Sequence, residues 1–200
     1  MRDFIEKLVA LFIIVLTSPV LVLVALAICI DSPGNPFYRA NRIGKDGRPF
    51  GMWKFRTMVK NARQLGPPVT GNNDPRLLRI GGFLRRAKLD ELPQFFNVLV
   101  GDMSLIGPRP EAPEFVHFYT PEQRQVLAYK PGITGRVQLD SGDESQNIPA
   151  GPEAGDYYVR HLMAGKLSSD IAYMQNRTAI SDLRILFSTA GYVFRSIARK

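Results

Sequence analysis

Two adjacent carboxylates form the most reactive pair in this sequence. Asp90 and Glu91 lie within residues 88–97 (KLDELPQFFN), where the pattern predicts a helix from about residue 90 to residue 100. An ionised Asp can attack phosphorus without a general base, and paired carboxylates can hold a divalent cation. Acidic residues and an early proline are also ordinary signals for a helix start, so the pair alone leaves both interpretations open.

Cationic side chains flank this pair and could offset the charge of a phosphate. Arg85 comes five residues before Asp90, and Arg109 lies between two prolines that fix its backbone. Guanidinium groups bind phosphate oxygens in pairs, which suits both arginines to substrate binding. Lys54 and Arg56 alternate with aromatic residues, so one strand face could present both cations to the site, with a solvated strand face as the alternative.

A long apolar segment precedes these residues. Residues 8–30 carry no charge and would measure about 35 Å as a straight helix, which is enough to cross a bilayer. A cleaved signal peptide is disfavoured, because the run is longer than a usual signal core and its amino-terminal flank has no net positive charge. The segment is therefore interpreted as a membrane anchor.

The anchor is interrupted at its midpoint by Ser18 and Pro19. Proline removes a backbone donor and disturbs the preceding turn, and a nearby hydroxyl from Ser18 or Thr17 can bond the carbonyl that is released. Two interpretations follow: a kinked helix that spans the membrane, or a re-entrant hairpin that breaks here and leaves on the side it entered. The residues alone do not decide between them.

The amino-acid composition limits the kinds of molecule that this protein is suited to bind. The chain has 26 Lys and Arg against 18 Asp and Glu, a net charge of +8, all of which belongs to the part after the anchor. Such a surface suits phosphorylated substrates, acidic lipids or nucleic acid. The single cysteine, Cys29, excludes a disulfide framework and a thiol zinc cluster, and it favours a reducing compartment.

The remaining residues alternate between short predicted elements and loops. Alternating apolar and polar residues predict a β-hairpin, and a turn leads into a short extended piece at residues 136–139. The basic apolar pattern of residues 181–200 is typical of a helix on an anionic membrane surface, or of a core helix with a basic end. The full prediction is a hairpin at 37–44 and 49–58, helices at 76–88, 121–128, 167–175 and 181–200, and loops at 65–74 and 140–156.

Several blocks in a fixed order resemble the bacterial sugar transferases, also called monotopic phosphoglycosyl transferases. Each block alone is weakly specific, but so many in one order are strongly specific. They are residues 17–19 (TSP), 54–58 (KFRTM), 83–85 (FLR), 89–94 (LDELPQ), 96–99 (FNVL), 101–104 (GDMS), 107–110 (GPRP), 131–135 (PGITG), 170–176 (DIAYMQN) and 182–186 (DLRIL).

The resemblance implies a fold and a place in the cell. We expect an α-rich α/β protein of the minimal, single-domain type. Residues 1–31 would form a re-entrant membrane helix-break-helix with its break at Ser18 and Pro19, which favours the hairpin. Residues 32–200 would form a catalytic domain with interfacial amphipathic helices, on the cytoplasmic face of a bacterial inner membrane.

The resemblance also implies a reaction. Members transfer a sugar-1-phosphate from a UDP-sugar to a polyprenol phosphate such as undecaprenyl phosphate, release UMP, require Mg²⁺, and begin the membrane stage of a glycoconjugate pathway. By position, Asp90 would be the nucleophile, through a covalent aspartyl-phosphosugar intermediate, and Glu91 its partner. Both carboxylates would be metal ligands, and the sequence does not divide that role between them.

One departure from the family concerns the substrate. After Gly135 the family commonly continues with a run whose Arg is thought to face the nucleotide sugar, whereas residues 139–145 here (LDSGDES) offer acids. Arg136 is the substrate-binding residue that could compensate. The change bears on which sugar is used more than on the reaction class.

Two other functions compete with transfer. One is a membrane-tethered basic module that binds anionic lipid or nucleic acid without catalysis, which would leave the Asp-Glu pair and the Pro-Arg-Pro corner unexplained. The other is a membrane phosphohydrolase that uses water as the acceptor. We expect no nucleic-acid partner, and the shared membrane surface leaves a homodimer open.

Overall fold

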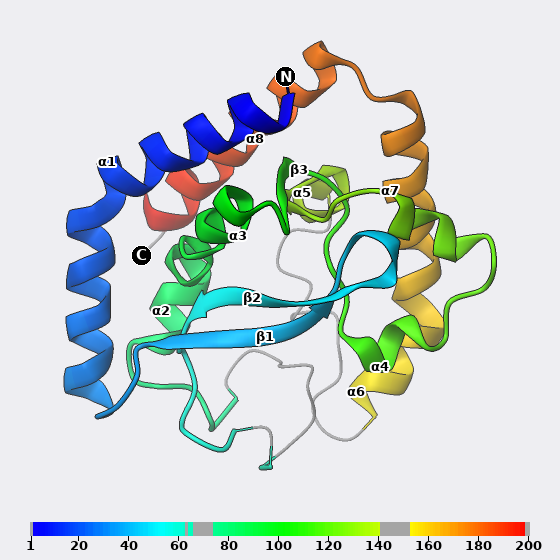
Figure 1. Ribbon diagram of the computed structural model, residues 1–200. Helices are drawn as coiled ribbons and strands as arrows, with labels where there is room; N and C mark the ends of the chain where they lie inside the picture. The colour runs from blue at the N-terminus through cyan, green and yellow to red at the C-terminus, as the bar shows by residue number, and fades with distance from the viewer. Residues whose placement is uncertain (1, 63, 66–73, 141–152, 199–200) are drawn as a thin grey trace.

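The computed structural model describes residues 2–62, 64–65, 74–140 and 153–198 (Figure 1). Helices surround two small sheets of two strands each within these residues, which confirms the α-rich α/β class. Most of the two predicted loops, 65–74 and 140–156, lies outside the described residues.

The anchor forms one helix with a marked change of direction. Helix α1 (Arg2–Asp31) contains Pro19, and Figure 1 shows it bending about midway along its length. Ser18 Oγ donates to the carbonyl of Val15, 2.8 Å away, which is the acceptor that Pro19 leaves without its usual donor. The expected capture of that carbonyl by a hydroxyl is therefore confirmed.

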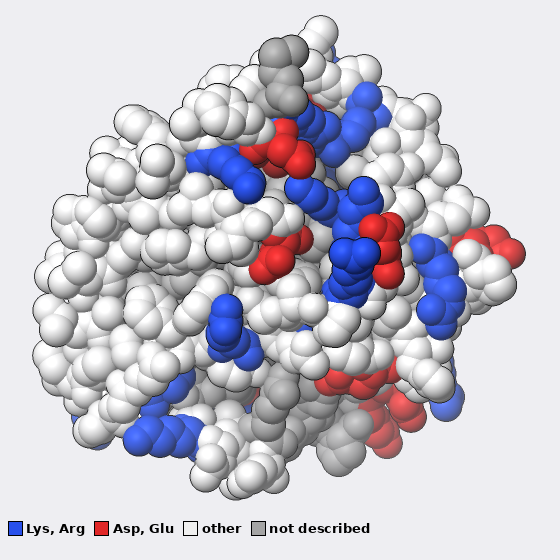
Figure 2. Space-filling model, viewed as in Figure 1, with Lys and Arg blue, Asp and Glu red and all other residues white. Residues whose placement is uncertain are grey.

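Helix α1 exposes most of its apolar surface. It is the one helix in the described part of the chain that is long and apolar enough to cross a membrane, and only 17% of its most apolar window is buried. Figure 2 shows that the upper left of the molecule, over much of α1, lacks charged side chains, whereas basic side chains lie at the lower left and further charges gather in the middle and on the right. A buried core helix would not leave this surface open, so these features indicate membrane association.

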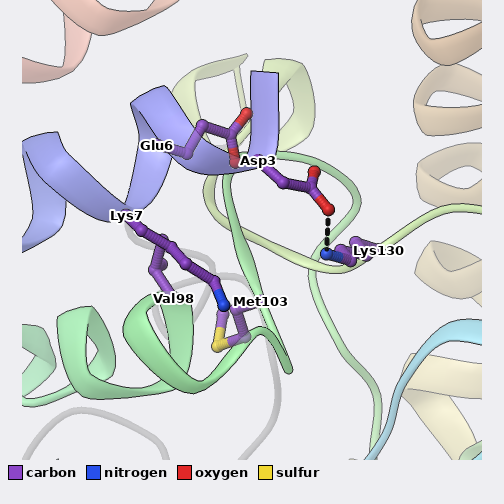
Figure 3. Close-up of a pocket in the computed structure, with 6 residues that line it drawn as sticks. All are labelled: Asp3, Glu6, Lys7, Val98, Met103 and Lys130. Carbon is purple, nitrogen blue, oxygen red and sulfur yellow. Dashed lines mark hydrogen bonds and ion pairs between the residues drawn. The ribbon is translucent and has the colours of Figure 1, made fainter. Parts of the chain in front are cut away.

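The amino-terminal end of α1 is bonded to the domain. Glu6 Oε2 accepts a hydrogen bond from Ser104 Oγ at 2.6 Å and another from the backbone N–H of Leu105 at 3.2 Å. Asp3 pairs with Lys130 at 2.8 Å. Figure 3 shows Asp3, Glu6 and Lys130 lining a small pocket beside α3.

The carboxyl-terminal end of α1 is bonded to the same domain. Arg56 Nη1 donates to Ser32 Oγ at 3.0 Å, and the backbone N–H of Ile80 donates to Asp31 Oδ2 at 3.3 Å. Val24 and Ile28 are buried in a cluster that includes Phe55, Leu78 and Leu84. Both ends of the helix are therefore attached to the same domain.

The predicted hairpin is confirmed. Strands β1 (Phe37–Ile43) and β2 (Pro49–Phe55) pair antiparallel, with Tyr38 opposite Lys54 and Ala40 opposite Met52. Because successive side chains alternate between faces, Lys54 shares one face with the buried Met52 and Ala40. The side chain of Lys54 therefore points toward the interior of the domain.

A second, parallel pair of strands was not predicted. Strand β3 (Ser104–Ile106) pairs with β4 (Gly132–Thr134), and the backbones approach so closely that a Cβ at Gly132 would lie 2.0 Å from the nitrogen of Gly107. The prediction of extended backbone at 136–139 was wrong, because helix α5 (Arg136–Asp140) occupies it. The pairing of β3 with β4 ends at Ile106 and Thr134, because Pro108 has no N–H to donate to a longer ladder.

The helix predicted at 76–88 is shorter in the structure. Helix α2 covers only Gly81–Arg86. The residues before it bond to the segment after β2 instead: the N–H of Leu78 donates to Thr57 O at 2.9 Å, and the N–H of Val59 donates to Arg76 O at 2.8 Å. Those backbone groups are therefore unavailable to a helical ladder.

The carboxyl-terminal part of the chain is helical, as predicted at 121–128, 167–175 and 181–200. Helix α8 runs beside the amino-terminal half of α1 (Figure 1), where Ile185 and Ala10 share a core cluster. Another hydrophobic cluster contains Phe115, Tyr158 and Leu167. The elements are α4 (Pro113–Val116), η3 (Gln123–Ala128), α6 (Ala154–Tyr157), a π-helix (Tyr158–Met163), α7 (Ala164–Asn176) and α8 (Ala179–Ala198).

Candidate active site

The carboxylate pair lies in a tight turn rather than in an α-helix. Asp90 and Glu91 occupy the 3₁₀ turn η2 (Leu89–Glu91), and helix α3 begins only at Gln94 (Gln94–Val100). The prediction of one helix over residues 90–100 was therefore wrong. Pro93 has no N–H for the carbonyl of Leu89, which instead accepts the i→i+3 bond from Leu92 at 3.3 Å.

Lys88 produces the sharp reversal before this turn. Its φ of 56° lies in the left-handed region, which costs a non-glycine residue about 1–2 kcal/mol. Such strain persists only where the surrounding structure holds it, and it is common at functional sites. The reversal separates α2 from η2 and turns the pair toward β2.

Asn97 fixes α3 against β2. Its Oδ1 accepts the backbone N–H of Trp53 at 2.9 Å, and its Nδ2 donates to the carbonyl of Gly51 at 2.9 Å. The side chain is almost fully buried, so these bonds are shielded from water. Because Trp53 precedes Lys54, the same bonds set the position of Lys54 relative to the pair.

Two cations converge on one carboxylate oxygen. Glu91 Oε1 lies 3.2 Å from Lys54 Nζ and 3.0 Å from Arg109 Nη2. Asp90 Oδ2 lies farther from Lys54 Nζ, at 4.0 Å. Asp90 is itself buried, with 6% of its surface exposed. The two neighbouring carboxylates therefore have different surroundings.

These surroundings drive their pKa values apart. Burial raises the pKa of Asp90, Lys54 opposes the rise, and the charge of Glu91 adds to it. Burial would also raise the pKa of Glu91, but Lys54 and Arg109 together outweigh it and hold this pKa well below its ordinary value. Burial lowers the pKa of Lys54, against the pull of both carboxylates. Glu91 thus stays ionised and engaged, while Asp90 is a poorly solvated carboxylate, a state suited to nucleophilic attack.

Arg85 lies beside the same turn. Its Nε donates to Thr57 Oγ1 at 3.0 Å, and its charge, like that of Lys88, lowers the pKa of Asp90. The structure therefore brings together Asp90, Glu91, Lys54, Arg85 and Arg109, all of which the sequence singled out.

Two predicted substrate-binding residues make their described contacts elsewhere. Arg56 bonds Ser32 at the end of α1. Arg136 is exposed and pairs with Asp140 within α5 at 2.7 Å. Their contact with substrate stays a prediction.

Arg42 belongs to the site and was missed as a candidate. It lies near the end of β1, where burial and the charge of Arg109 lower its pKa against the pull of Glu111. Its Nε is buried and has no hydrogen-bond partner among the residues that the structure describes. The sequence held a signal, because Arg42 is two residues from the buried Ala40 and therefore shares its strand face.

The donor set is compatible with Mg²⁺. Among the described residues, no group of three or more His, Cys, Asp and Glu side chains could hold a metal unaided. Magnesium is usually held by one or two carboxylates together with substrate phosphates, and Asp90 with Glu91 offers the carboxylates. The residues therefore fit a cation that arrives with a phosphorylated substrate.

Comparison with known proteins places the chain in a family. It matches the bacterial sugar transferase family over residues 1–196, and it belongs to that family. The resemblance seen in the sequence motifs is confirmed.

Individual relatives agree with this assignment. The chain is 36% identical to the UDP-glucose:undecaprenyl-phosphate glucose-1-phosphate transferase of Escherichia coli (strain K12), over 96% of this chain and 39% of the relative. It is 37% identical to the UDP-N-acetylgalactosamine-undecaprenyl-phosphate N-acetylgalactosaminephosphotransferase of Aeromonas hydrophila, over 92% and 41%. It is 36% identical to the exopolysaccharide production protein PSS of Rhizobium leguminosarum bv. phaseoli, over 94% and 90%. The chain thus spans about two fifths of the length of the first two relatives.

Substitution of Lys54 tests the electrostatic balance of the site. Lys54→Met should lower the free energy of unfolding by about 3 kcal/mol, because it leaves buried carboxylates without their central cation. Adding Glu91→Gln should recover part of the loss, since one of those charges is removed. Chemical unfolding of the detergent-solubilised protein measures both effects.

The matched control for this prediction is Lys130→Met. Lys130 forms an exposed ion pair with Asp3, so its loss should change the unfolding free energy by less than about 1 kcal/mol. Equal effects of the two lysine variants, or additive effects of Lys54→Met and Glu91→Gln, would contradict this view of the site.

Proposed function

We propose that this protein transfers a sugar-1-phosphate from a UDP-sugar to a polyprenol phosphate such as undecaprenyl phosphate and releases UMP. The observation that carries the proposal is the pair Asp90–Glu91, in which one buried carboxylate is engaged by Lys54 and Arg109 and the other is left reactive. Family membership supports it, as do the relatives named for UDP-sugar and undecaprenyl-phosphate chemistry.

In the first step, a carboxylate oxygen of Asp90 attacks the phosphorus that bears the sugar. The bond from this phosphorus to the bridging oxygen breaks, and UMP leaves with the electron pair. The product is a mixed anhydride between Asp90 and the sugar phosphate. Arg109 and Arg85 would bind the phosphate oxygens, and Lys54 would keep Asp90 ionised.

In the second step, a phosphate oxygen of the polyprenol phosphate attacks the same phosphorus. The bond to Asp90 breaks, the carboxylate is regenerated, and the sugar diphospholipid leaves. Asp90 and Glu91 would hold Mg²⁺, whose charge would offset that of the diphosphate. The ion pairs of Glu91 support a role for it in ordering the cations around the phosphates.

The contacts at the two ends of α1 support a particular membrane arrangement. Because Glu6 is bonded to β3 and Ser32 to Arg56, both ends of the helix meet the same domain, which favours a re-entrant hairpin broken at Ser18 and Pro19 over a spanning helix. Helix α8 exposes Phe187 and Phe194 and would lie on the lipid surface. We place residues 32–200 on the cytoplasmic face of a bacterial inner membrane, where a water-soluble nucleotide sugar can meet a lipid phosphate.

The proposed intermediate predicts a separable first step. Without lipid acceptor, the wild-type protein with Mg²⁺ and a reactive UDP-sugar should release about one UMP per active site and then stop. Asp90→Asn should lower this release at least a thousandfold, since an amide is a poor nucleophile, and Glu91→Gln should slow it less. Rapid-quench assays across a panel of UDP-sugars measure the release.

The control is Asp46→Asn, which changes an exposed carboxylate in the hairpin turn and should leave the burst intact. Continued UMP release without lipid would support a phosphohydrolase instead. Full turnover by Asp90→Asn would show that another group is the nucleophile.

The hairpin predicts that both ends of α1 face the same compartment. In a Cys29→Ala background, single cysteines introduced by Arg2→Cys and Ser32→Cys should both be protected from an impermeant maleimide in intact cells, and both should react after lysis. Asp46→Cys marks the side of the domain. Labelling of the Arg2→Cys site from outside, with the Ser32→Cys site protected, would establish a spanning helix.

A further inference from the structure

A second group of sequestered polar side chains lies next to the corner that carries Arg109. Glu111 comes two residues after Arg109, and its carboxylate accepts a hydrogen bond from the hydroxyl of Tyr158. Lys166 Nζ lies 3.9 Å from the same carboxylate oxygen and donates to Tyr158 Oη at 3.1 Å. The side chains of Glu111 and Lys166 are only 12% and 13% exposed, and Tyr158 is buried, so these contacts are shielded from water.

The tyrosine is itself held in place by two helices. Tyr158 is the first residue of the π-helix (Tyr158–Met163), a rare turn that is frequent at functional sites. Its ring packs against Phe115 of α4 at a centroid distance of 5.1 Å. On α7, Lys166 Nζ lies 4.8 Å from the centre of the same ring. The hydroxyl therefore has a fixed direction from which to bind Glu111.

The corner that carries Arg109 is anchored on both sides. Before it, the carbonyl of Pro108 accepts the backbone N–H of Gly132 at 2.9 Å. After it, the carbonyl of Glu111 accepts the backbone N–H of Ile43 at 2.9 Å. The two prolines that flank Arg109 restrict the backbone between these anchors. Its guanidinium then extends to the carboxylate pair of η2, at 3.0 Å.

Stability alone does not account for an acid at this place. Tyr158 belongs to a hydrophobic cluster, and replacing a buried ion pair with apolar side chains of similar volume is often neutral or stabilising. A charged hydrogen bond differs from apolar packing in its direction, because it is strong only in one geometry. The contacts of Glu111 therefore suit a residue that sets a position.

We propose that Glu111 is a positioning residue for sugar-phosphate transfer, which holds the end of the corner so that the guanidinium of Arg109 reaches the substrate phosphate. Tyr158 and Lys166 hold Glu111 in turn. The carbonyl of Glu111 also bonds the end of β1, next to Arg42. The inference rests on the proposed function, because it takes Arg109 as a phosphate ligand.

A double-mutant cycle with Arg109→Ala tests the proposal. Tyr158→Phe removes one hydroxyl and keeps the ring, so it should raise the KM for the UDP-sugar about fivefold, with kcat changed less. In the Arg109→Ala background the same substitution should add less than about twofold, because the residue that is positioned is gone. Steady-state assays of the detergent-solubilised protein with Mg²⁺ and polyprenol phosphate measure both effects.

The matched control is Tyr173→Phe. Tyr173 Oη donates to Asp182 Oδ1 at 2.6 Å, so this variant also loses a bond from a phenol to a carboxylate, but away from the corner. It should lower the free energy of unfolding by an amount similar to the loss in Tyr158→Phe and leave KM unchanged. A merely structural role for the Tyr158 hydroxyl would make the two variants alike in KM as well.

The outcomes separate this inference from the proposed function. If Arg109→Ala alone leaves KM unchanged, the assigned role of Arg109 is wrong and the inference fails with it. If Arg109→Ala raises KM but Tyr158→Phe has no effect, or the two effects are additive in free energy, Glu111 does not act through Arg109. Should Tyr158→Phe fail to fold, Glu111→Gln keeps the shape of the side chain, removes its charge, and should show the same coupling.

Discussion

The structure depends on burying two carboxylates side by side. An unpaired buried carboxylate destabilises a fold by several kcal/mol, so the charge of the pair must be offset within the protein. The cations come from distant parts of the chain, Lys54 from β2 and Arg109 from the corner after β3. The site therefore exists only when the hairpin, η2 and the parallel strands have all formed in register.

This dependence explains several features that are otherwise unrelated. Asn97 bonds the backbone on both sides of Met52, which fixes the strand that carries Lys54. The close approach of Gly107 and Gly132 allows the corner with Arg109 to lie against β4. The bonds at the two ends of α1 join the same scaffold to the membrane segment. A water-soluble phosphate donor and a lipid acceptor could then meet at one surface.

Much of the site could be predicted from the sequence, because its chemistry is carried by residue types at close spacing. The Asp-Glu pair, Lys54 in an alternating strand and Arg109 between prolines are local signals. The parallel strands could not be predicted, since three-residue strands such as β3 show no periodicity of their own. Pro93, however, did signal the interrupted helix, since its missing N–H is visible in the sequence.

The central claim is that Asp90 carries the sugar phosphate between donor and acceptor. The most direct measurement is mass spectrometry of peptides from protein that has been quenched in acid after exposure to UDP-sugars and Mg²⁺ without lipid. The account predicts that the peptide containing residues 88–97 gains the mass of one sugar phosphate at Asp90, and that polyprenol phosphate removes it. Turnover-competent protein with Asp90 unmodified, or with the added mass on another residue, would contradict it.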